Sequence, residues 1–190
     1  MKKFLMLFAT IALFFVGGEA VQGAESINDI NIDDYEHEIT YQDDEITVGT
    51  FGNNEEIAEL LENSPTAVAS YSPLNTDPFA ITPFATGYGP GGVSRIDVAS
   101  SDNRTIFWAV TPSTKWPYYF EGRIQLRYYS GFSRDALVTG IGAIGTSSTG
   151  YIRLNAHKGG KATLVGNAYD ATFKRYAVVP NVSSAFGASR

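Results

Sequence analysis

Two neighbouring stretches of the chain have hydrophobic patterns that predict β-strands of different kinds. From Arg104 to Thr111 the apolar residues are nearly continuous, and Pro112 follows them. A short apolar run rich in β-branched and aromatic residues predicts a central strand that is covered on both faces. From Tyr118 to Tyr129 apolar and polar residues alternate. This alternation predicts a strand with one face on the core and the other toward water.

More strands are predicted around this pair. Segments rich in Gly, Ser, Asn and Asp separate the apolar stretches, which is typical of turns between antiparallel strands. Such strands without a helical repeat predict an all-β antiparallel sandwich of immunoglobulin-like size in the C-terminal half, with a small barrel as the alternative. The glycines of strand 134–144 predict a bulge or an edge position. The predicted strands span residues 93–99, 104–111, 118–129, 134–144, 149–156, 161–169 and 173–179.

The N-terminal half differs sharply in charge. Between Gln22 and Pro90 there are 14 acidic residues and no Lys or Arg, whereas residues 91–190 carry 12 Lys or Arg and 5 acidic residues. Within the acidic half, residues 54–62 predict one short helix with an Asn cap and glutamates in its first turn. We expect the remainder to be largely irregular, with the piece EITVGTF as a candidate isolated strand.

These patterns predict four segments. Residues 1–23 read as a signal peptide with two lysines, an apolar core and small residues, and cleavage after either Ala20 or Gly23 fits. Residues 24–63 form an acidic leader or propeptide-like segment, 64–92 a Pro/Gly-rich linker, and 93–190 the β-sandwich domain. The apolar run is short for a membrane span, so we expect a secreted, extracellular protein with no transmembrane span after cleavage.

The absence of cysteine narrows the possible chemistry. No cysteine occurs in the chain, which excludes disulfides, thiol chemistry and a cysteine-linked lipid anchor. Small secreted animal domains usually depend on disulfides, so we expect a bacterial, Gram-positive origin.

The sequence predicts neither an enzyme nor a metal site. The two histidines, His37 and His157, have no second His or Cys at metal-ligand spacing. A hydrolase would need Ser130 or Ser133, His157 and Asp135 to converge, and no pattern in the sequence predicts this. The acidic pairs lack EF-hand spacing, and the glycine clusters lack a phosphate-loop frame. We therefore expect no catalytic residues and no cofactor.

The outward face of strand 118–129 is the candidate binding surface. Arg and Tyr alternate there, and these side chains suit contacts with phosphate, carboxylate or sugar groups. The expected partners are an anionic cell-wall polymer, a polysaccharide or membrane headgroups, and export disfavours nucleic acid. A plain solvated sheet face is the simpler interpretation. The candidate residues are Tyr119, Arg123, Arg127 and Tyr129, with Arg153, Lys161 and Lys174 expected to join them from neighbouring strands.

Two functional hypotheses follow from the charge division. In the first, the protein is a secreted, non-enzymatic β-sandwich binding module whose basic face contacts anionic polymers of the cell envelope. In the second, it is an antimicrobial or toxin-like effector made as a precursor, and the acidic segment is a propeptide that shields the basic domain. The two hypotheses differ in whether the acidic segment is removed.

Overall fold

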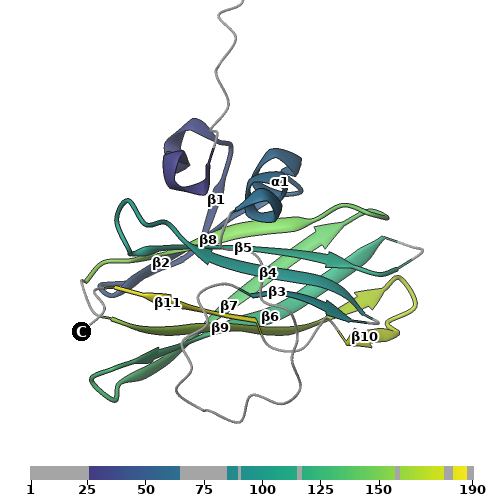
Figure 1. Cartoon of the computed structure of the whole chain (residues 1–190). Helices are drawn as coiled ribbons and strands as arrows, with labels where there is room; N and C mark the ends of the chain where they lie inside the picture. The colour runs from purple at the N-terminus through teal and green to yellow at the C-terminus, as the bar shows by residue number, and fades with distance from the viewer. Residues whose placement is uncertain are drawn as a thin grey trace, which may run out of the picture.

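The chain forms two layers of antiparallel strands, shown in Figure 1. The structure is a computed structural model and describes residues 26–64, 85–89, 91–114, 117–156, 159–177 and 182–187. Within these residues the fold is an all-β sandwich, as predicted. The expected signal peptide, residues 65–84 of the expected linker and His157 lie outside the described residues.

The first sheet has six strands in the order β1-β2-β8-β5-β4-β3. The central strand β5 is buried at every position from Thr105 to Val110, which confirms the prediction made from its continuous apolar run. The strands are β1 (Glu38–Gln42), β2 (Ile46–Gly52), β8 (Ser148–Leu154), β5 (Thr105–Pro112), β4 (Gly92–Val98) and β3 (Ala85–Gly89).

The second sheet has the order β10-β9-β6-β7, and β11 also pairs with β9. Buried and outward-facing residues alternate along β6, as its sequence pattern predicted. The glycine-rich strand β7 lies at the edge and pairs with β6 without a register shift, so the edge prediction is confirmed and no bulge forms. The strands are β10 (Arg175–Ala177), β9 (Gly160–Asp170), β6 (Tyr118–Tyr128), β7 (Ser133–Gly142) and β11 (Val182–Phe186).

Among the described residues all seven predicted strands are present, and β10 begins at Arg175, two residues later than predicted, while residues 178–179 of that prediction lie outside the described residues. Three further strands were not predicted, namely β1, β3 and β11. Strand β3 lies in the expected linker and pairs with β4 in an unbroken register. Glycine-rich composition concealed this strand, because Gly is depleted in most strands.

The acidic segment is part of the sandwich. Strand β2 pairs with β8 through Thr50 opposite Gly150, and its residues Ile46 and Val48 are buried in the core between the sheets. The boundary expected at residue 93 therefore does not separate the sandwich from the acidic segment. The piece EITVGTF does form a strand, but it has partners on both sides, β1 and β8.

The predicted helix is also present and lies outside the sandwich core. Helix α1 spans Glu55–Asn63, and the backbone N–H of Ile57 donates to the side-chain oxygen of Asn54 at 3.0 Å. This bond satisfies one of the free N–H groups at the helix start. The buried residues of α1 are Ile57, Ala58 and Leu61.

A second apolar core forms where the acidic segment covers the outer face of the first sheet. Figure 1 shows α1 and the preceding short helices on the side of β5 and β8 that faces away from the second sheet. We call residues 26–35 together with α1 the N-terminal cover. Its residues Ile27, Ile57 and Leu61 belong to one buried cluster with Phe107 and Tyr151 of the sheet. The cover includes the 3₁₀ turns η1 (Ile27–Asp29) and η2 (Ile32–Asp34).

Two polar contacts join β4 to the last turn of α1 and to Ser64, the residue after the helix. The guanidinium of Arg95 lies 3.2 Å from the carboxylate of Glu62. The hydroxyl of Ser64 donates to the carboxylate of Asp97 at 2.7 Å. Burial raises the pKa of Asp97 to about 6. The carboxyl group of Asp97 is therefore held under the cover at an energetic cost whenever it is ionised.

Candidate binding surface

The outward side chains of β6 and its two neighbours form an exposed surface on the second sheet, which we call the open face. Its position follows from the strand alternation, because every second residue of β6 points away from the core. Tyr119, Arg123 and Arg127 are all exposed there, as predicted. The open face comprises Tyr119, Glu121, Arg123, Gln125 and Arg127 of β6, Asp135, Leu137, Thr139 and Ile141 of β7, and Lys161, Thr163, Val165, Asn167 and Tyr169 of β9.

One end of the open face is aromatic and aliphatic. The register places Tyr119 between Ile141 of β7 and Tyr169 of β9. The rings of Tyr119 and Tyr169 have centroids 6.4 Å apart and planes inclined by 32°. Because the two planes are only moderately inclined, the pair offers a broad apolar surface whose hydroxyl groups remain able to hydrogen-bond.

The other end of the open face is cationic. Arg127 lies opposite Lys161 of β9. Asp135 of β7 accepts from Arg127 at 2.8 Å and lies 3.6 Å from the guanidinium of Arg123. These ion pairs are exposed, so they contribute little to stability.

The open face is less basic than the sequence predicted. Its three cations are Arg123, Arg127 and Lys161, and its two carboxylates are Glu121 and Asp135. Three positive and two negative side chains leave a formal charge of +1 on the open face. The arrangement therefore suits a ligand that carries hydroxyl groups as well as acidic groups better than a purely anionic surface.

Two predicted residues lie beyond the ends of the open face. Tyr129 is exposed in the turn after β6, and its N–H donates to the carbonyl of Gly159 at 3.0 Å. Lys174 lies in the turn after β9, where its N–H donates to the carboxylate of Asp170 at 2.8 Å. Tyr129 therefore extends the cationic end, and Lys174 lies at the tyrosine end.

Arg153 does not join the open face, contrary to expectation. It belongs to β8, and it points to the outer side of the first sheet because its neighbours Ile152 and Leu154 point into the core. The alternation of residues in β8 correctly predicts that Arg153 points away from the core. It does not indicate to which of the two sheets β8 belongs. Residues Tyr169, Leu137 and Ile141 were missed, although the same alternation in β7 and β9 would have placed them outward.

Arg153 instead lines a polar pocket of about 300 Å³ beside the N-terminal cover. The ring of His37 stands edge-on to the ring of Tyr151 there, with centroids 5.8 Å apart. The Nδ1 of His37 lies 2.9 Å from the carbonyl oxygen of Tyr35, so this nitrogen carries the proton in the neutral ring. The other lining groups include carboxylates, amides and hydroxyls, among them Asp33, Gln42, Thr47 and Asp102.

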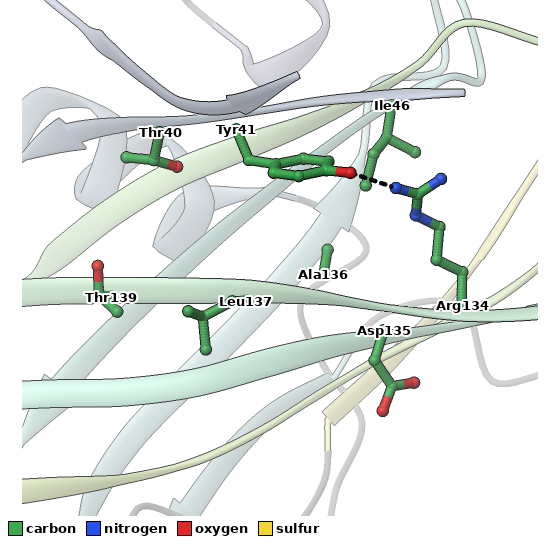
Figure 2. Close-up of a pocket in the computed structure, with 8 residues that line it drawn as sticks. All are labelled: Thr40, Tyr41, Ile46, Arg134, Asp135, Ala136, Leu137 and Thr139. Atoms are coloured by element: carbon green, nitrogen blue, oxygen red, sulfur yellow. Dashed lines mark hydrogen bonds between the residues drawn. The ribbon is translucent and has the colours of Figure 1, made fainter. Parts of the chain in front are cut away.

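A second hollow of about 330 Å³ lies between the edge strands β1 and β7 and is shown in Figure 2. Arg134 and Ala136 point from β7 toward β1, whereas Asp135 points away. The guanidinium of Arg134 donates to the hydroxyl of Tyr41 at 3.1 Å and pairs with Asp43 and with Glu45. The pairing with Arg134 holds the pKa of Asp43 well below its usual range. Arg134 thus connects the β1–β2 hairpin to the second sheet.

Asp135, one member of the hypothetical hydrolase set, is paired with two arginines, and His157 lies outside the described residues. Among the described residues there is no group of three or more His, Asp or Glu side chains that could hold a metal ion. None of the helices in these residues is both long and apolar enough to cross a membrane.

Comparison with known proteins assigns no family. No protein-family model matches the chain, and no curated protein sequence is significantly similar to it. The function must therefore be argued from the geometry of the surface.

Proposed function

We propose that the protein is a secreted, non-enzymatic bacterial binding module whose open face holds an acidic polysaccharide of the cell envelope. The observation that carries this proposal is the side-by-side pair of Tyr119 and Tyr169 on the same sheet face as the cationic row of Arg127 and Lys161. Tyrosine rings pack against the apolar faces of sugar rings, and guanidinium groups bind carboxylate or phosphate.

The dimensions of the open face favour an extended ligand. Tyr119 and Arg127 are both on β6 and are separated by eight residues, which corresponds to about 26 Å along a strand. A single small anion would reach only one end of such a surface. An extended polymer with acidic substituents reaches both ends, and its sugar rings can pack against the tyrosine pair, so we favour a polysaccharide over a membrane surface.

Export is supported by the sequence of residues 1–23 and by the absence of cysteine.

The precursor hypothesis is less favourable, because removal of the acidic segment would take β1, β2 and α1 away from the first sheet. The edge of β8 and the apolar residues beneath the cover would then be exposed to water.

The proposal is tested by affinity electrophoresis in gels that contain alginate, an acidic polysaccharide, or dextran, a neutral one. We expect alginate to retard the wild-type protein, and Tyr119→Ser to weaken binding about fivefold or more, because truncating an aromatic contact residue often costs above 1 kcal/mol. The matched control is Tyr88→Ser, which removes a tyrosine that is 69% exposed on β3 of the other sheet.

A second pair of variants tests the cationic end. Lys161→Gln and Arg153→Gln each remove one positive charge from an exposed residue, the first on the open face and the second on the opposite sheet. We expect Lys161→Gln, and not Arg153→Gln, to reduce the retardation by alginate. Lys161→Gln should also make the retardation less sensitive to salt concentration. Equal mobility of Tyr119→Ser, Lys161→Gln and the wild type in alginate would exclude the open face as the binding site.

A further inference from the structure

Strand β7 presents a long unpaired edge. It spans Ser133–Gly142, and among the described strands only β6 pairs with it. Its pairing with β6 continues over ten residues without a bulge. The free edge therefore offers a regular row of backbone N–H and C=O groups that can pair with another strand.

The other sheet edges of the sandwich are shorter or protected. Strand β1 has five residues and a register shift between Ile39 and Tyr41. Strand β3 also has only five residues. The second edge of β9 is occupied by β10 at one end and by β11 at the other. Short strands and bulges are devices that prevent pairing between molecules, and β7 has neither.

The side chains of β7 also favour pairing. From Ala136 to Gly142 the strand has the sequence ALVTGIG, without a charged residue or a proline. Leu137 is 64% exposed and Ile141 is 71% exposed, and both flank the half-buried Thr139 on the outward face. Two large aliphatic side chains beside an open backbone edge gain contact area when a second strand joins the sheet.

We propose that β7 pairs antiparallel with β7 of a second copy of this chain, about a two-fold axis at Thr139. In this register Leu137 lies opposite Ile141 of the second copy, Ile141 lies opposite Leu137 of the second copy, and the two Thr139 residues face each other. Both aliphatic residues therefore gain an aliphatic partner, and threonine pairs are favourable across antiparallel strands. The pairing is centred on the seven uncharged residues 136–142.

Other registers match the side chains less well. An axis at Leu137 would place Ile141 opposite Ser133 of the second copy and Thr139 opposite Asp135. An axis at Val138 would place Ile141 opposite Asp135 of the second copy. The axis at Thr139 instead places Asp135 opposite Ala143 and brings the exposed Ile144 of the second copy opposite Arg134, at the hollow between β1 and β7. This self-complementarity is the reason to prefer a second copy over an unrelated peptide.

The expected dimer is weak and reversible. Pairing along one edge of seven residues buries less surface than a standard stable interface. Sedimentation velocity of the full chain should show a sedimentation coefficient that rises with protein concentration. Leu137→Lys should abolish this rise, because a lysine would lie against Ile141 of the second copy. The control is Phe173→Lys, which replaces a residue that is 87% exposed in the turn after β9 and should leave the rise unchanged.

Crosslinking tests the register independently. The chain contains no cysteine, so Thr139→Cys and Ser133→Cys each introduce a single thiol. Opposed residues in antiparallel strands lie about 4.5 to 5.5 Å apart, within the range that a disulfide spans, so Thr139→Cys should form dimers on mild oxidation. In the same register the two Ser133 positions are separated by about 40 Å. Ser133→Cys should therefore form no disulfide-linked dimer, although Ser133 is the more exposed residue.

Two results would overturn this inference. One is a wild-type sedimentation coefficient that is independent of concentration or unaffected by Leu137→Lys. The other is oxidation of Thr139→Cys to a dimer no faster than Ser133→Cys. Leu137 and Ser133 are exposed, and far-UV circular dichroism of each variant verifies that the sandwich is intact. The inference does not depend on the identity of the ligand at the open face.

Discussion

The two sheets of the sandwich differ in what lies on their outer faces. The outer face of the first sheet carries Phe107, Ala109 and Tyr151, and the N-terminal cover buries all three. The outer face of the second sheet carries Arg123, Arg127 and other polar residues, and it is exposed. One face is therefore part of the hydrophobic interior, and the other is available to a ligand.

An acidic segment serves here as a structural layer on the first sheet. The cover has a high density of carboxylates, yet its few aliphatic residues are spaced so that Ile27, Ile57 and Leu61 reach the sheet together. The acidic residues of the cover are exposed to water. Because they dominate its composition, the composition alone does not indicate that the cover has an apolar side. The charge division therefore separates the cover and the β1–β2 hairpin from the later strands, although β2 pairs with β8 across it.

The largest effect on stability should come from removal of the cover together with the β1–β2 hairpin, which lies between its two parts in the chain. A variant without residues 26–63 loses β1, β2 and α1, exposes Phe107 and leaves one edge of β8 unpaired. We expect it to lose cooperative unfolding altogether, because apolar surface and backbone groups are left without partners. Thermal unfolding followed by circular dichroism and by binding of a hydrophobic dye measures this.

Cooperative unfolding of the shortened chain near the wild-type midpoint would contradict this expectation. The acidic segment would then be dispensable for folding, and the precursor hypothesis would regain support.

A matched pair of substitutions compares the two faces at single residues. Leu61→Ala removes a side chain that is buried under the cover, and Leu137→Ala removes one that is 64% exposed on the open face. We expect Leu61→Ala to lower the free energy of unfolding by about 2 to 5 kcal/mol. Leu137→Ala should lower it by less than about 1 kcal/mol. Urea unfolding at low protein concentration measures both, and equal losses would show that the cover is not a packed layer.

The contribution of the buried Asp97 of β4 to stability should depend on pH. Burial raises the pKa of Asp97 to about 6, whereas an unfolded chain has a value near 3.9. Between about pH 4 and pH 6 the folded protein therefore keeps a proton that the unfolded chain has lost, so this group lowers the stability as the pH rises through this range. Above pH 6 both states are ionised and the cost is constant.

The substitution Asp97→Asn removes the titrating carboxyl group. The side-chain carbonyl oxygen of the asparagine should still accept the hydrogen bond from the hydroxyl of Ser64. We expect the stability difference, variant minus wild type, to increase by up to about 3 kcal/mol between pH 4 and pH 6, since each tenfold change in an ionisation constant is worth about 1.4 kcal/mol. Asp43 titrates in the opposite sense below pH 4, because Arg134 lowers its pKa, so the measurement is made above that value. Parallel stability curves for the two proteins would exclude the buried carboxyl group as the cause.

Much of the strand pattern could be predicted from the sequence, because it depends on local periodicity. The alternation in β6 and the continuous apolar run in β5 each reported the burial of their own strand correctly. The run in β5 even indicated that both of its faces are covered. It could not indicate what covers them, because that depends on contacts with Ile57 and Leu61, about fifty residues earlier in the chain.

The candidate surface was predicted only in part for a related reason. Periodicity places a residue on one side of its own strand, so Tyr119, Arg123 and Arg127 were assigned correctly to an exposed face. The position of that strand in one sheet or the other depends on pairing between distant segments. Arg153 was misplaced because β8 pairs with β2 and β5 of the first sheet and makes no pairing with β6 or β9.

The pairing of β2 with β8 also has a consequence for the order in which the molecule forms. The hydroxyl of Thr50 bonds to the carbonyl of Thr149, 99 positions later in the chain. The first strands to be synthesised therefore have no partner on one side until most of the chain exists. Closing so long a loop is slow, since its entropic cost precedes any stabilising contact, and sandwiches of this kind fold in milliseconds to seconds. During synthesis β2 can therefore pair with β8 only once residues 148–154 have been made.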